Sequence, residues 1–109
     1  MNSLIQKHQT TLEIICRSLP VDTLYVFGSG ADSSLQDESD LDFLVHFESD
    51  LSAQDYADTY FLLHKKLSAL FNRSIDLITE RSLSNPYFTE SINSSKKLIY
   101  DKKHQKISV

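Results

Sequence analysis

The chain has 109 residues, of which 40% are hydrophobic, and its formal net charge is −4 at pH 7. This length suits one domain with its own core, so we expect residues 1–109 to form a single domain. No stretch approaches the ~20 consecutive apolar residues needed to span a bilayer. Residues 1–10 also lack the apolar core of a signal peptide. We therefore expect a cytoplasmic protein without a membrane partner.

Charge is distributed unevenly along the sequence. Residues 1–64 contain 11 acidic residues against Lys7 and Arg17, whereas residues 65–109 contain nine basic residues against four acidic ones. Solvated surface is the usual explanation for such runs. The overall acidity argues against a long nucleic acid as partner, because proteins that bind one usually present a net basic face.

The first half of the chain predicts a helix followed by two strands. Apolar residues recur at helical spacing over residues 3–19, and Pro20 closes the segment. The single Cys16 has apolar neighbours in this helix, so we expect it to be packed rather than reactive. Residues 23–27 and 41–47 read as strands. The polar segment between them has room for a short helix from Ser29 to about Ser34.

The second half predicts a long helix, a third strand, a short helix and a fourth strand. Ser52 is placed to cap a helix over residues 53–71, which ends at Asn72. Residues 74–79 then read as a strand. After Asn85 and Pro86 we expect a helix to about residue 93, a strand at residues 98–100 and a polar tail from about residue 102.

The most informative motif joins Gly28-Ser29 to Asp40 and Asp42. In a strand, residues i and i+2 point to the same face, so both carboxylates project together about 7 Å apart at the backbone. The residues that alternate with them are apolar, which predicts one buried face and one acidic face. Hard divalent cations such as Mg²⁺ prefer oxygen ligands, and two aspartates are a typical protein contribution.

The Gly28-Ser29 turn is suited to binding phosphate. Gly28 has no Cβ, so backbone amides can approach an anion closely, and Ser29 adds a hydroxyl donor. Unpaired amides at the start of a following helix would add to this attraction. Gly-Ser-Gly alone is usually a turn, and Ser-Asp-x-Asp alone often caps a helix. Their order, with the second motif entering an apolar strand, is much rarer and favours a nucleotide and metal site.

Asp76 is an acidic residue inside the predicted third strand. It has two explanations: an edge-strand side chain that faces water, or a third carboxylate beside Asp40 and Asp42. We favour the compact triad.

With these motifs placed, the chain resembles the minimal nucleotidyltransferases of the DNA polymerase β-like superfamily over most of its length. The family pattern of a strand ending in Gly-Ser, about ten residues and then Ser-Asp-hydrophobic-Asp corresponds to Gly28-Ser29 and Ser39-Asp40-Leu41-Asp42. Residues 73–78 resemble the strand with the third acid, and residues 85–100 resemble the C-terminal segment. The resemblance implies an α/β (α+β) nucleotidyltransferase fold with a small mixed sheet of about four strands flanked by helices.

The resemblance also implies an activity and its site residues. Asp40, Asp42 and Asp76 would bind two Mg²⁺ ions and serve catalysis, and Gly28, Ser29 and Ser39 would bind the nucleotide. An acceptor hydroxyl would attack the α-phosphate of a nucleoside triphosphate such as ATP, and pyrophosphate would leave.

One position departs from the family pattern. The family usually continues Gly-Ser-x-Ala-Arg-Gly, whereas here Ala31 is followed by Asp32 and Ser33. The basic phosphate contact is therefore missing, and an aspartate there would either repel a triphosphate or contribute to metal or partner binding.

Size narrows the acceptor, because larger relatives use an extra domain for it and this chain has no residues left for one. Minimal nucleotidyltransferases often act as antitoxins of a HEPN-type ribonuclease toxin, either by adenylylating (AMPylating) a tyrosine or by binding. We therefore expect a protein adenylyltransferase that uses ATP and forms a hetero-oligomer with such a toxin. The alternatives are a catalytically silent antitoxin that neutralises by binding alone, and a nucleotidyltransferase for a small hydroxyl-bearing substrate.

Overall fold

The structure is a computed structural model that describes residues 3–31 and 40–104. The helices are α1 (Ser3–Lys7), α2 (Gln9–Arg17), α3 (Ala53–Phe71) and α4 (Pro86–Ser95). The strands are β1 (Val21–Phe27), β2 (Leu41–Phe47), β3 (Ile75–Thr79) and β4 (Lys97–Asp101), and short 3-10 turns occur at η1 (Gly28–Ala31), η2 (Glu80–Ser82) and η3 (Lys102–His104). Within these described ranges, no helix is both long enough and apolar enough to cross a membrane.

The strands form one mixed sheet in the order β3-β2-β1-β4. β1 pairs with both β2 and β4 in antiparallel fashion, and β2 pairs with β3 in parallel. The long helix α3 connects the two parallel strands, as a parallel pair requires a crossover. The four-stranded mixed sheet expected from the resemblance is confirmed.

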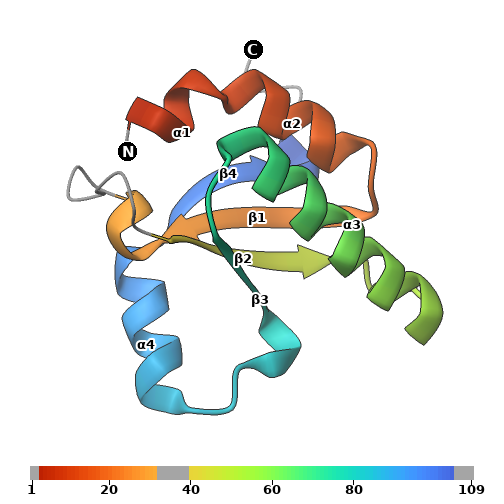
Figure 1. The fold of residues 1–109 in the computed structure, drawn as a ribbon. Coiled ribbons are helices and arrows are strands. Elements are labelled where there is room, and N and C mark those ends of the chain that lie inside the picture. Colours follow the sequence, from red (N-terminus) through yellow and green to blue (C-terminus); the bar gives the residue numbers. More distant parts are fainter. Residues whose placement is uncertain (1–2, 32–39, 105–109) are drawn as a thin grey trace.

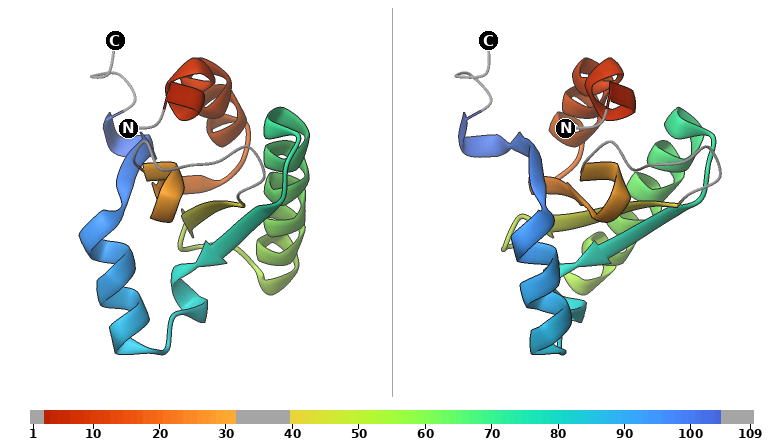
Figure 2. Two further views of the ribbon diagram at one scale, coloured as in Figure 1. Left: turned by 60° about the vertical axis from the view of Figure 1, so that its left-hand side comes forward. Right: turned by 90° about the vertical axis from the view of Figure 1, so that its left-hand side faces the viewer.

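Helices cover both faces of the sheet (Figure 1). Phe43 and Val45 of β2 face α1, α2 and α3, and they belong to the larger buried cluster together with Leu63 and Leu67 of α3. Leu44 points to the other face, where α4 supplies Ile92 to a smaller cluster. The turned views in Figure 2 show the same separation of α4 from the other helices. This alternation confirms the predicted burial pattern of residues 41–47.

Local signals explain how α3 begins and ends. The hydroxyl of Ser52 accepts a hydrogen bond from the backbone amide of Asp55 at 3.1 Å, which satisfies one free amide of the first turn. Asn72 adopts a left-handed conformation with φ of 50°, and its amide donates to Ser68. The cap and the stop residue predicted from the sequence are both confirmed.

Some boundaries differ from the sequence prediction. The helix predicted over residues 3–19 is divided at His8, whose ring packs edge-on against Phe71 at 5.2 Å, into α1 and α2. β1 begins at Val21, where it pairs with Phe47, and β4 is longer by one residue at each end. The turn after β1 is 3-10 helical over Gly28–Ala31. The rest of the predicted short helix lies outside the described residues.

Candidate active site

Two of the three predicted carboxylates are brought together by strand register. Asp42 of β2 and Asp76 of β3 are direct partners in the parallel pair. Both residues share the sheet face of Leu44 and Ile78, which is the face covered by α4. Asp40 directly precedes β2 and is exposed. The three aspartates therefore lie at the edge of the sheet where β1 ends and where β2 and β3 begin.

The environment of Asp42 disfavours its charged form. Asp42 is half-buried, and its pKa is raised above the usual aspartate value first by loss of hydration and then by the charges of Asp76 and Asp40. A cation placed between these carboxylates would relieve the repulsion. The site is thus suited electrostatically to a positively charged partner.

Gly28 completes this edge from the neighbouring strand. It follows Phe27, which pairs with Asp42 across the antiparallel ladder. The φ of Gly28 is +64°, and a Cβ built there would lie 2.7 Å from Oδ2 of Asp42. Only glycine meets both demands without strain, because it tolerates this backbone conformation and has no side chain to collide with the carboxylate.

The remaining predicted nucleotide-binding residues are described only in part. Ser29 lies in the η1 turn directly after Gly28, and this turn packs against α4. Ser39 and Asp32 both lie outside the described residues. The structure therefore places the Gly28-Ser29 backbone beside the carboxylates and leaves the roles of Ser29 and Ser39 as predictions.

The residues at this edge have the donor chemistry that Mg²⁺ prefers, since all three side chains offer carboxylate oxygens. Among residues 3–31 and 40–104, however, no three His, Cys, Asp or Glu side chains are gathered tightly enough to form a ready-made set of metal ligands. Asp42 and Asp76 share a register position, and Asp40 flanks them. The residues fit a magnesium site in the chemistry of their oxygen ligands.

Sequence reasoning missed two residues next to this edge, Tyr60 and His64 of α3. The Tyr60 hydroxyl donates to the carbonyl of Leu77, and the His64 ring contacts the carbonyl of Ile75. The pKa of the Tyr60 phenol is raised by burial and then by the Asp76 charge. Their i, i+4 spacing predicts that both lie on one face of the helix, but it does not predict which strand that face contacts.

Comparison with known proteins agrees with this geometry. Residues 9–105 match the family described as "Polymerase beta, Nucleotidyltransferase". A protein of Methanocaldococcus jannaschii named "Putative protein adenylyltransferase" is 30% identical over 100 residues, which is 92% of this chain and 93% of that protein.

Two solved structures share the fold. A toxin-antitoxin crystal structure with AMP-PNP superposes with a TM-score of 0.67 at 19% identity, covering 91% of this chain and 78% of that one. A tri-AMPylated HEPN toxin of Shewanella oneidensis in complex with its MNT antitoxin gives 0.62 at 18% identity, covering 95% and 78%. Since the family match spans most of the sequence and the aspartates stand at the expected edge, the chain belongs to the polymerase beta nucleotidyltransferase family.

Proposed function

We propose that this chain is a Mg²⁺-dependent protein adenylyltransferase that transfers AMP from ATP to a tyrosine of a HEPN-type toxin and thereby acts as its antitoxin. The observation that carries the proposal is the pairing of Asp42 with Asp76 beside Gly28, on a chain of this family. The name of the archaeal relative and the AMPylated toxin bound to a structural neighbour support the acceptor class. Toxin and antitoxin would work in the cytoplasm as a hetero-oligomer.

The proposed reaction assigns a task to each residue of the edge. Asp40, Asp42 and Asp76 would hold two Mg²⁺ ions, which when bound stabilise charge on the phosphates and lower the pKa of the acceptor hydroxyl. The tyrosine oxygen attacks the α-phosphorus in line, and the bond to the departing pyrophosphate breaks. Asp76, which is exposed on the outer strand, would accept the phenol proton. The Gly28-Ser29 backbone and Ser39 would contact the departing phosphates.

The test is transfer of AMP in a purified system. Wild-type protein, ATP, Mg²⁺ and the HEPN-type toxin that it is proposed to modify should yield toxin that is heavier by one or more AMP groups in intact mass spectrometry. Asp42→Asn should lower the rate at least about 100-fold, because several kcal/mol of transition-state stabilisation depend on the metal site. Asp50→Asn removes an exposed carboxylate beyond the other end of β2 and should retain activity. Absence of transfer by the wild type to a verified toxin would refute the proposal.

A second candidate is an antitoxin that neutralises by binding alone. Asp32 favours it, because it stands where the family usually has a phosphate-binding arginine. In that case the double variant Asp40→Asn/Asp42→Asn would still protect cells from the toxin, whereas the adenylyltransferase proposal predicts loss of protection. Turnover of ATP with a small hydroxyl-bearing compound and no protein partner would instead support a free-standing nucleotidyltransferase.

A further inference from the structure

β3 carries Asp76 on the outer edge of the sheet, and among the described strands it pairs with β2 alone. The amide of Leu41 donates to the carbonyl of Ser74 at 3.1 Å, so the carbonyl before β3 faces β2. Hydrogen-bonding direction alternates along a strand, which turns the carbonyls of Ile75 and Leu77 outward. The two residues that flank Asp76 thus depend on groups outside the sheet for their hydrogen bonds.

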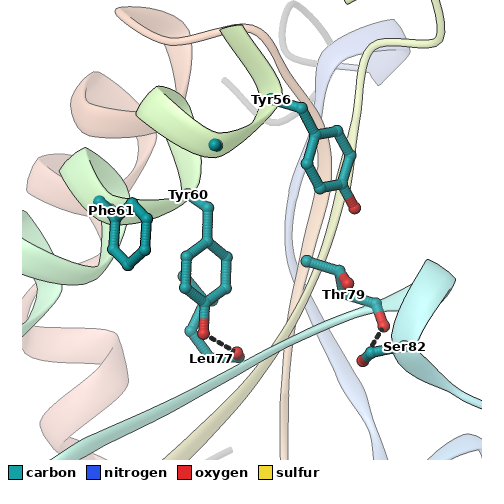
Figure 3. A pocket seen from close by; sticks show the side chains of 7 residues that line it. Tyr56, Tyr60, Phe61, Leu77, Thr79 and Ser82 are labelled. Carbon is teal, nitrogen blue, oxygen red and sulfur yellow. Dashed lines mark hydrogen bonds between the residues drawn. The ribbon is translucent and has the colours of Figure 1, made fainter. Parts of the chain in front are cut away.

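Helix α3 provides those groups. The Tyr60 hydroxyl donates to the carbonyl of Leu77 at 2.7 Å, as Figure 3 shows. Nε2 of His64 lies 3.0 Å from the carbonyl of Ile75 and donates to it in the tautomer that carries the proton on Nε2. The two rings are stacked, with centroids 6.5 Å apart and planes inclined by 26°. One turn of α3 therefore holds the backbone on both sides of Asp76.

Buried side chains hold α3 in place against the sheet, and with it the Tyr60 and His64 contacts to β3. α3 has 19 residues, and its Leu63 and Leu67 are fully buried against the sheet. Tyr60 also forms part of the wall of a pocket of about 340 Å³ between α3, β3 and η2 (Figure 3). Because burial and the Asp76 charge raise the pKa of Tyr60, its phenol keeps its proton and remains a donor at neutral pH.

We propose that Tyr60 and His64 are positioning residues that fix the edge strand at Leu77 and Ile75 and so keep the Asp76 carboxylate in register with Asp42 for metal binding. The inference rests on the proposed metal-dependent function of this edge. Neither side chain is required to touch the substrate or the ions, since both act through the backbone of β3.

The chain offers a matched pair of variants for the test. Tyr60→Phe removes the donating hydroxyl and keeps the ring, whereas Tyr56→Phe removes from the same helix a buried hydroxyl that has no hydrogen-bond partner among residues 3–31 and 40–104. Without toxin or ATP, Mn²⁺ binding is followed by the electron paramagnetic resonance signal of the free ion. Tyr60→Phe should weaken binding about tenfold, as expected from one lost hydrogen bond. It should also speed amide exchange in β3, and Tyr56→Phe should change neither quantity.

His64 gives a second, independent comparison. His64→Gln retains an N–H donor of similar reach and should keep most of the Mn²⁺ affinity, whereas His64→Leu should lose it to the same degree as Tyr60→Phe. With toxin and ATP, the Mg²⁺ concentration for half-maximal transfer should rise in Tyr60→Phe and His64→Leu, and kcat at saturating Mg²⁺ should recover. A change that only destabilised the fold would not raise the Mg²⁺ requirement and leave kcat at saturating Mg²⁺ unchanged.

The outcomes separate this inference from the proposed function. Wild-type affinity for Mn²⁺ in both Tyr60→Phe and His64→Leu would overturn the positioning role. So would the absence of any Mn²⁺ binding that depends on Asp42 in the wild type. If the wild type binds Mn²⁺ through Asp42 but transfers no AMP to the toxin, the proposed function fails, and the binding data alone still decide the role of Tyr60 and His64.

Discussion

A Cβ atom on Gly28 would lie 2.7 Å from Oδ2 of Asp42. This separation is shorter than non-bonded carbon and oxygen atoms tolerate, so the turn after β1 and the carboxylate of β2 fit together only while residue 28 is glycine. The turn and the carboxylate belong to one site, so a substitution at Gly28 should displace the Asp42 carboxylate.

Gly28→Ala should therefore reduce activity by more than its effect on stability explains. The left-handed backbone costs a residue with a Cβ about 1–2 kcal/mol, and the contact displaces the Asp42 carboxylate in addition. We expect AMP transfer to fall at least tenfold, about 1.4 kcal/mol in the transition state. Asn72→Ala is the control, because Asn72 also has positive φ but lies away from the carboxylates at the end of α3. It should lose stability and keep activity, as measured by urea unfolding and transfer assays.

The raised pKa of Asp42 predicts a specific pH dependence of stability. Since the folded state binds this proton more tightly than the unfolded state, the stabilising contribution is complete below the unfolded pKa of about 3.9 and is lost as pH rises through the folded pKa. At pH 7 Asp42→Asn should therefore unfold at a higher temperature than wild type, and the difference should shrink towards pH 4. Mg²⁺ should stabilise the wild type and not the variant. Equal Mg²⁺ stabilisation of both would argue against Asp42 as a ligand.

The small buried cluster beneath α4 should affect both the stability of the fold and the activity of the site. Ile92 is 2% exposed and packs with Phe27 and Leu44. Phe27 directly precedes Gly28, and Leu44 lies on the same face of β2 as Asp42. Ile92→Ala should cost about 2–5 kcal/mol of unfolding free energy and should lower activity through loosening of α4. Ile14→Ala removes the same atoms from a side chain that is 55% exposed and should change stability by less than about 0.5 kcal/mol. Chemical denaturation of both variants measures the contrast.

Cys16 should resist thiol reagents in the folded protein. Burial, with a further contribution from Glu13, raises its pKa to about 12, so the reactive thiolate is nearly absent at pH 8. Ellman's reagent should label it at the rate at which the protein opens and should label it rapidly in urea. Rapid labelling of the native protein would show that α2 leaves the sheet far more readily than its packing indicates.

Most of the fold could be predicted because its strongest signals are local. The apolar spacing of residues 53–71 and the alternation of residues 41–47 each determine one element and its buried face. The predicted first helix is divided at His8, whose ring packs against Phe71 more than sixty residues away in sequence, and no local pattern contains that contact. The same applies to the strand ends, where pairing partners such as Phe47 for Val21 decide the boundary.

The site was predictable to the extent that its residues are neighbours in sequence or follow the family pattern. Asp40, Asp42 and Gly28 belong to a single motif, and Asp76 stood out as an acidic residue inside an apolar strand before the resemblance added to its case. From the sequence we favour a triad over an edge-strand side chain that faces water; the structure gives Asp76 an exposed side chain on an edge strand in register with Asp42, and its role with the other acids stays a prediction. Tyr60 could not be found in advance, since its role depends on how α3 crosses over β3.

The hydrogen bonds at the sheet borders also bear on how this protein can associate. Ser82 donates to the carbonyl of Thr79 at 2.8 Å, next to the two acceptors of β3 that α3 already occupies. On the opposite border, Gln9 of α2 donates to the carbonyl of Ile99 in β4 at 2.8 Å. Exposed strand edges are templates for aggregation and fibre growth, and side chains that occupy their acceptors hinder a foreign strand from adding there. Addition of a partner's strand to the sheet is therefore hindered at these carbonyls.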